Sequence, residues 1–266
     1  MKTFDPVAAL ALPPDAFVDR RVPKALLLDN GAPTAPDKHW IREHIKQLHW
    51  LAALKPNTIG VAKYRDEERE YLEIAVLKLV LRAAPGAARP VELLQLPNGR
   101  VDRLVEIVHR AVPYPVLLVT WRGKEPEISM AHKRRSRADA AETVLDGEVI
   151  VVRLRGDCAD QPVAAFREAL ALVRQPQTTL YALYQGWLDT LHALRAANVT
   201  GEFSLPTSGA TATTRRNALE EYQRLNERIA EVHLAANKEL QLSRRVELNL
   251  ELARLRNDRD VVRSRL

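Results

Sequence analysis

The chain contains one cysteine, Cys158, among its 266 residues. A lone cysteine excludes an intrachain disulfide and a zinc site built from several thiolates. The ten glycines never form the G-x-G-x-x-G or G-x-x-x-x-G-K patterns whose backbone cradles phosphates, so nucleotide hydrolysis is not expected. We therefore expect no cofactor and no bound metal.

Long apolar runs are also missing. No stretch approaches the roughly 18 continuous apolar residues that a membrane-spanning helix needs. The opening residues, MKTFDPVAALAL, hold an early aspartate and proline, and their apolar run is too short for a secretory signal. The sequence predicts a cytoplasmic protein without a membrane anchor.

Neither sign of charge is in large excess. Lysine and arginine total 40 against 34 aspartates and glutamates, which gives a formal net charge of +6. The two signs are largely interspersed, so the attraction to polyanions such as DNA is weak. A hydrophobic content of 46% with 28% charged residues is typical of a folded soluble protein.

The first three quarters of the chain predict a mixed domain over residues 1–197. Residues 37–55 carry apolar side chains at helical intervals, with Asp37 as the N-cap and Pro56 as the stop. Further predicted elements are helices at 25–28, 102–111, 161–174 and 179–197, a loop at 83–97, a hairpin from 116 to 131 and a strand at 149–154.

Two strands are predicted around the acidic run at 66–70. Residues 58–61 are β-prone, and residues 71–82 are so strongly apolar that they belong in the middle of a sheet, covered on both faces. With the hairpin that follows, these strands predict an α+β fold with a mainly antiparallel sheet and packed helices.

The C-terminal part reads as a polar linker over 198–214, followed by a coiled-coil-like helix over 215–266 that lacks proline and glycine. Two apolar seams run along it, the first through Tyr222, Leu225, Ile229, Val232 and Ala236, the second through Leu248, Leu252, Leu255 and Val262. The seams are out of register. Either the stripe drifts around one long helix, or the chain turns back between residues 238 and 243 to form a helical hairpin.

These seams are the candidate surface for partner proteins or for a second copy of the chain, because a long helix must bury its apolar face. The candidate partner-binding residues are Tyr222, Leu225, Ile229, Val232, Arg244, Arg245, Leu248, Leu252 and Leu255. We expect the second half, residues 244–266, to bind the partner.

Basic side chains concentrate after a predicted strand, where they could contact phosphates while a neighbouring tryptophan adds stacking. The candidate nucleic-acid-binding residues are Trp121, Arg122, Lys124, His132, Lys133, Arg134, Arg135 and Arg137. A solvated strand end, or a contact with an acidic protein, explains the same pattern.

No catalytic motif stands out. A metal-dependent nuclease would place an acidic residue two positions before a lysine on one strand, and neither Asp-x-Lys nor Glu-x-Lys occurs. Asp66, Glu73 and Lys78 are the remaining candidates for a divergent site of this kind. No catalytic residue is assigned.

Several segments resemble a bacterial family labelled domain of unknown function 4391. They are WLAALKPNT at 50–58, YLEIAVLKLVL at 71–81, AVPYPVLLV at 111–119, MAHKR at 130–134 and KELQLSRRVELNLELARL at 238–255. The resemblance covers nearly the whole chain and involves fold and interface motifs rather than catalytic ones.

Members of that family are typically encoded beside DNA methyltransferases and Swi/Snf-type helicases in anti-phage or restriction-like loci. The resemblance thus implies a non-catalytic accessory subunit of such a complex, which binds these proteins and DNA. The alternatives are a divergent metal-dependent nuclease and a structural homo-oligomer.

Overall fold

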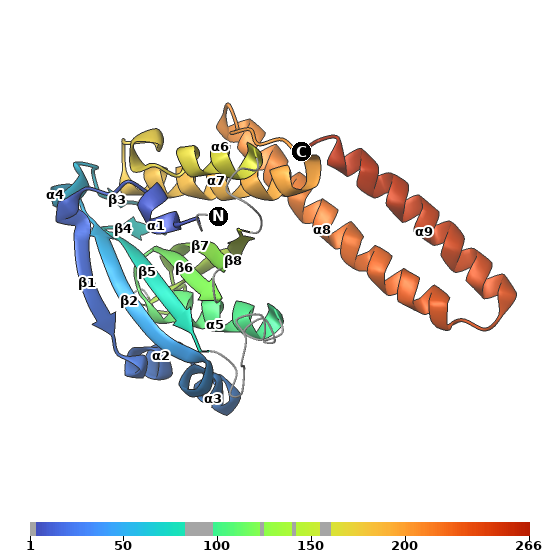
Figure 1. Ribbon diagram of the computed structural model, residues 1–266, viewed down its shortest axis with the longest axis horizontal. Helices are drawn as coiled ribbons and strands as arrows, with labels where there is room; N and C mark the ends of the chain where they lie inside the picture. The colour runs from blue at the N-terminus through green and yellow to red at the C-terminus, as the bar shows by residue number, and fades with distance from the viewer. Residues whose placement is uncertain (1–3, 83–97, 123–124, 140–141, 155–160) are drawn as a thin grey trace. The chain divides into compact units, whose positions relative to one another are not determined.

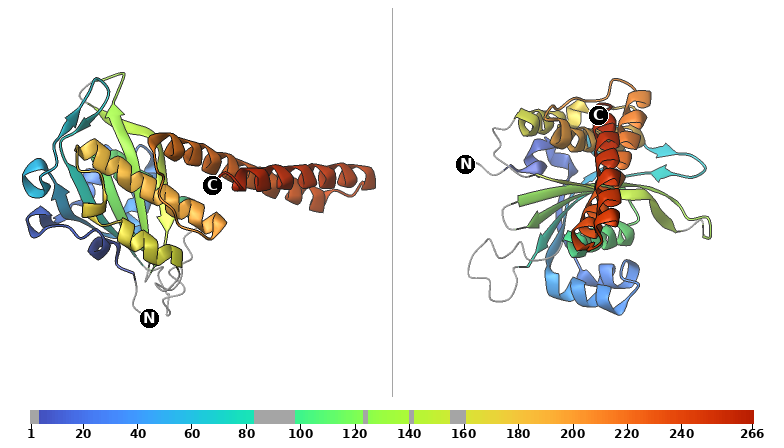
Figure 2. Two further views of the ribbon diagram at one scale, coloured as in Figure 1. Left: turned by 90° about the horizontal axis from the view of Figure 1, so that it is seen from above. Right: turned by 90° about the vertical axis from the view of Figure 1, so that its right-hand side faces the viewer.

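The computed structural model describes residues 4–82, 98–122, 125–139, 142–154 and 161–266 (Figures 1 and 2). The chain divides into two compact units, Met1–Leu191 and His192–Leu266. The division falls inside the helix α7 (Leu180–Thr200).

The described strands of the first unit form a six-stranded sheet in the order β1-β2-β5-β6-β7-β8. β5 and β6 are parallel, and the other neighbours are antiparallel. The strands are β1 (Phe17–Val22), β2 (Ile45–Leu54), β5 (Ile74–Leu81), β6 (Val116–Arg122), β7 (Glu125–Arg135) and β8 (Thr143–Arg153), and a separate small sheet pairs β3 (Tyr64–Arg65) with β4 (Glu70–Tyr71). The expected fold class, a mainly antiparallel sheet with packed helices, is confirmed.

Helices cover both faces of this sheet. Figure 1 shows α2 (Lys24–Asn30), α3 (Ala35–His44) and α5 (Asn98–Ala111) on one side. On that side, Leu104 and Val108 of α5 share one core with Leu77 in β5. The other face carries α1 (Pro6–Ala9), α6 (Gln161–Ala169) and the first part of α7. The short elements α4 (Pro56–Ile59), η1 (Pro14–Ala16) and η3 (Leu172–Arg174) complete the unit.

The helix predicted over residues 37–55 is wrong beyond His44. The chain leaves α3 there and continues as the strand β2, which pairs with both β1 and β5. Two register shifts in the pairing with β5 break the period-two alternation that marks a strand in sequence. The N-cap is also not Asp37 but Thr34, whose hydroxyl accepts a hydrogen bond from the Asp37 amide at 3.3 Å.

The strand predicted at 58–61 is wrong as well, because Pro56–Ile59 forms the one-turn helix α4. The central strand at 71–82 is confirmed as β5, which lies between β2 and β6. The hairpin from 116 to 131 is confirmed as β6 and β7. The loop predicted at 83–97 lies outside the described residues.

The second unit contains a hairpin of two long helices, α8 (Gly209–Lys238) and α9 (Leu242–Arg263). A capping box of Ser208 and Thr211 starts α8. The chain turns at residues 239–241, inside the predicted range, so the hairpin alternative is confirmed and the single continuous helix is wrong.

The two helices of this hairpin run side by side in opposite directions (Figure 1). Their common core contains Val232, Ala236 and Leu252, and Ile229, Leu248 and Leu255 pack against it. Ion pairs of 2.9 Å, Arg228 with Glu251 and Arg265 with Glu221, link the helices outside this core.

Gly31 follows the last residue of α2 and lies against α5. A substitution at this position therefore tests how closely α2 packs on α5. A β-carbon at this position would lie 2.6 Å from the Ile107 carbonyl oxygen and 2.9 Å from the Ala111 β-carbon. We expect Gly31→Ala to lower the free energy of unfolding by about 1–3 kcal/mol, because the backbone of α5 would have to shift. Urea denaturation measures this.

Gly99→Ala is the control for that substitution. Gly99 lies in the first turn of α5, and its added β-carbon would meet nothing within 4 Å. This variant should be as stable as the wild type or slightly more stable, because alanine favours helix. Equal stability of both variants would contradict the close approach of α2 to α5.

Candidate functional site

Lys133, the centre of the predicted basic cluster, is buried and only 2% exposed. Its amine donates a hydrogen bond to the carbonyl oxygen of His109 at 2.6 Å and another to that of Val112. These carbonyls lie at the end of α5, where the last turn of a helix leaves acceptors without intrahelical partners. Burial lowers the pKa of Lys133 to about 7. The amine therefore binds the free carbonyl groups at the C-terminal end of α5 and does not face solvent.

His132 is held inside a group of aromatic side chains rather than at the surface. Its Nε2 donates to Oε1 of Gln185 at 2.8 Å, and the Tyr71 hydroxyl lies 2.5 Å from Nδ1. The ring stacks on Tyr181 with 5.2 Å between centroids. A bond to each ring nitrogen and a stacked neighbour fix the imidazole, so it joins α7 to β7.

The arginines of the cluster face carboxylates. Arg122 and Glu127 form a buried pair at 3.1 Å. Arg134 lies 3.8 Å from Asp146, and one guanidinium nitrogen of Arg135 lies 3.6 Å from Glu70. These pairs neutralise much of the positive charge that the sequence places here.

The other cluster members are spread out. Trp121 is contacted by the amine of Lys78, which lies 5.5 Å from the centroid of its ring. Arg137 is exposed, and Lys124 lies outside the described residues. Lys133, His132 and Arg122 bind to groups inside the unit, so these three residues do not form part of an open basic surface.

A small pocket remains beside the strand end. It has a volume of about 180 Å³ and is lined by Glu70, Leu72, Pro113, Tyr114, Lys133, Arg134, Arg135 and Thr143. The guanidinium groups of Arg134 and Arg135 and one carboxylate line it, together with the hydroxyl-bearing residues Tyr114 and Thr143, while the Lys133 amine is bound to backbone carbonyls. This composition suits a small anion better than a cation.

The residues suspected of nuclease chemistry have separate partners. Glu73 pairs with Lys55 at 2.9 Å, Lys78 lies over Trp121, and Asp66 accepts a hydrogen bond from the Tyr64 hydroxyl at 2.7 Å. Within the described residues, no three His, Cys, Asp or Glu side chains gather closely enough to hold a metal ion. In the same part of the chain, no helix has the length and apolar character needed to cross a membrane.

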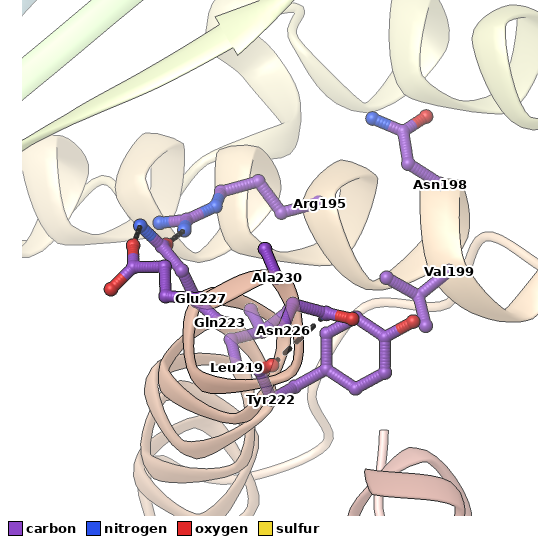
Figure 3. Close-up of a pocket in the computed structure, with 9 residues that line it drawn as sticks. All are labelled: Arg195, Asn198, Val199, Leu219, Tyr222, Gln223, Asn226, Glu227 and Ala230. Atoms are coloured by element: carbon purple, nitrogen blue, oxygen red, sulfur yellow. Dashed lines mark hydrogen bonds between the residues drawn. The ribbon is translucent and has the colours of Figure 1, made fainter. Parts of the chain in front are cut away.

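The second unit holds an open groove of about 470 Å³ between the end of α7 and α8 (Figure 3). Its apolar lining comes from Val199, Leu219, Tyr222 and Ala230, and its polar lining from Arg195, Asn198, Gln223, Asn226 and Glu227. Three of the polar residues are bonded in series: Arg195 donates to Gln223 at 2.8 Å, and Gln223 donates to Glu227 at 3.2 Å.

Figure 3 shows Arg195 reaching Gln223 on one side of the groove, while the Tyr222 ring and Val199 lie on the other. Apolar side chains with a fixed polar rim form the kind of surface that receives an anchoring side chain of another protein. Of the predicted partner-binding residues, Tyr222 lines this groove.

The other predicted partner-binding residues divide into two groups. Ile229, Val232, Leu248, Leu252 and Leu255 pack against one another inside the hairpin, and Leu225 is half-buried. Arg244 and Arg245 are exposed on α9. The seams thus stabilise the hairpin itself, because the turn at 239–241 lets each seam cover the other.

No pattern in the sequence indicates that Arg195, Asn198 and Val199 belong to a site. They lie at the end of α7, and only the turn at residues 201–208 brings them against α8. One signal was available: α8 places Leu219, Tyr222, Asn226 and Ala230 at intervals of three and four, a face beside the hairpin seam.

Comparison with known proteins identifies a family for most of the chain. A family model described as Domain of unknown function (DUF4391) matches residues 10–258. No curated protein and no solved structure is significantly similar to the chain. The match spans both the pocket and the groove.

The buried amine of Lys133 predicts how stability depends on pH. Its pKa is about 7 in the folded chain and has the ordinary value of 10.5 when exposed, so above pH 7 the unfolded state binds more protons. Stability should therefore rise from pH 7 to about pH 9, by up to about 1.4 kcal/mol per pH unit, and this contribution is lost as pH falls through 7.

Lys133→Met should flatten this rise and lower stability at pH 9, because two carbonyls lose their donor. Denaturation at pH 7, 8 and 9 measures the slope. Lys63→Met, which removes an exposed lysine, is the control and should keep the wild-type slope. A Lys133→Met variant that keeps the same slope as the wild type would show that the amine is not buried.

Proposed function

We propose that this chain, which belongs to the DUF4391 family, is a non-catalytic accessory subunit of a DNA-modification or restriction-like anti-phage complex. The groove between α7 and α8 carries the proposal, because it is an open apolar depression with an ordered polar rim. A partner subunit inserts an apolar side chain there, and its backbone or polar groups meet Arg195, Asn226 and Glu227 at the rim.

The partner in this proposal is a DNA methyltransferase or a Swi/Snf-type helicase. Support for these two proteins comes from the resemblance of the chain to a family encoded beside them. The groove supports a protein partner in general, because its volume of about 470 Å³ accommodates one or two large side chains. A cytoplasmic location follows from such a role.

Ala230→Arg tests this contact by filling the groove with a long side chain. Ala230 is exposed and lines the groove, so the substitution should leave the fold intact and weaken capture of the partner by about tenfold or more. The measurement is a pull-down of the neighbouring methyltransferase and helicase by the purified chain.

Ala235→Arg is the matched control, since Ala235 is also an exposed alanine of α8 but lies outside the groove. It should capture the partner as well as the wild type does. The proposed groove contact is wrong if Ala230→Arg retains full capture, or if both variants lose it equally.

A contact with DNA is the second part of the proposal, and the small pocket beside Arg134 and Arg135 favours it. This pocket of about 180 Å³ presents the guanidinium groups of Arg134 and Arg135 and two hydroxyl-bearing residues, which suits the oxygens of one backbone phosphate. The contact would position DNA and would carry no sequence preference.

Replacing Arg134 and Arg135 together by alanine should weaken DNA binding at low salt by about tenfold and lower the salt dependence by about two phosphate contacts. Fluorescence anisotropy against salt concentration measures both. A variant with Arg42 and Arg110 replaced by alanine removes the same charge from exposed positions on α3 and α5. If the two double variants bind DNA alike, the pocket holds no phosphate.

A further inference from the structure

The helix α9 is apolar on two opposite faces. Its inner face packs on α8 through Leu248, Leu252 and Leu255. Its outer face carries Leu242, Val246, Leu250 and Val261, which are 66%, 50%, 57% and 55% exposed. Val246, Leu250 and Ala253 each precede an inner residue by two positions, and two positions turn a helix by about 200°. The hairpin can therefore cover only one of the two faces.

The outer face forms one continuous stripe, which we call the outer stripe. Its members are Leu242, Val246, Leu250, Ala253, Asn257 and Val261, at intervals of four, four, three, four and four, and the polar residues Ser243 and Asp260 lie in the same arc near its two ends. The spacing keeps them within about 100° of one another over about 29 Å of helix. Three large aliphatic side chains in a row, those of Leu242, Val246 and Leu250, form a helix-packing surface rather than scattered exposed residues.

We propose that the outer stripe binds the outer stripe of a second copy of this chain, with the two α9 helices antiparallel about a two-fold axis between Leu250 and Ala253. In this register Leu250 faces Ala253 of the second copy, and Val246 faces Asn257 of the second copy. The large Leu250 side chain meets the small Ala253 side chain on both sides of the axis, which lets the helix axes approach closely there. The interface is self-complementary, as a two-fold contact requires.

Charges beside the stripe select the antiparallel direction. Glu247 and Arg254 flank the same edge of the stripe, and the two-fold axis sets Glu247 opposite Arg254 of the second copy, twice in the dimer. A parallel pair would set Arg254 beside Asn249 and Glu247 beside Leu242, with no opposite charges facing. None of the ion pairs formed within the described hairpin uses either side chain.

This surface is separate from the groove, which α7 and α8 line, so the inference goes beyond the proposed function. A dimer through α9 leaves each groove open and doubles the number of partner subunits that one assembly can hold. Loss of partner capture and loss of dimerisation therefore have different causes and can be distinguished.

Light scattering of the full chain tests the inference. The wild type should have twice the chain mass, and Leu250→Glu should weaken dimerisation by about 100-fold, because two buried leucines per dimer become charged. Leu234→Glu is the matched control: Leu234, on α8, is 59% exposed against 57% for Leu250 but lies outside the stripe, and its variant should remain a dimer. A monomeric wild type, or a dimer that survives Leu250→Glu, overturns the inference.

Charge reversal tests the direction of pairing. Glu247→Arg alone and Arg254→Glu alone should each weaken the dimer by about tenfold, because like charges then face across the axis. A mixture of these two variants should form a heterodimer of wild-type affinity, since every facing pair is again opposite in sign. Failure of the mixture to recover dimerisation would exclude the antiparallel register, even if Leu250→Glu is monomeric.

Discussion

The offset of two residues between the apolar stripes of α9 is the constraint on which the second unit depends. The inner stripe stabilises the hairpin, and the ion pairs Arg228 with Glu251 and Arg265 with Glu221 link the helices outside that contact. The outer stripe exposes half or more of the surface of Leu242, Val246, Leu250 and Val261. A helix with two apolar faces is most stable in water when both faces are covered, which is why we propose a second copy of the chain as the partner of the outer stripe.

The first unit uses its polar groups to hold its own elements together. The Lys133 amine closes the end of α5, His132 joins β7 to α7 through Gln185 and Tyr71, and Arg122 is buried against Glu127. Buried polar groups of this kind fix a unique arrangement because each would be costly to leave unbonded. These bonds hold the helices against the sheet. The surfaces that we propose for other molecules are the small pocket beside Arg134 and Arg135, the groove and the outer stripe.

The sequence predicted the fold class, the central strand β5, the β6–β7 hairpin and the turn between α8 and α9, because each has a local signal in its apolar spacing or turn residues. It failed for β2, because Ile45, Leu48 and Leu51 recur at helical intervals. This segment is a strand because it pairs with β1 and β5, and that pairing has no local signal in the sequence. The burial of Lys133 was equally hidden, since its partners lie more than twenty positions away. The intervals of four from Leu242 to Leu250 indicate the outer stripe in the sequence. They overlap with the second predicted seam, which starts at Leu248 in the same helix, and so the two patterns are hard to separate.

The most direct test of the account is a disulfide between two chains. One chain carries Leu250→Cys and the other Ala253→Cys, with the single natural cysteine, Cys158, replaced by serine in both. Mild oxidation of the mixture should give a covalent dimer that contains one chain of each kind, because the two-fold axis sets these positions face to face. The account is contradicted if the mixture stays monomeric, or if Leu234→Cys on α8 replaces Leu250→Cys with equal yield.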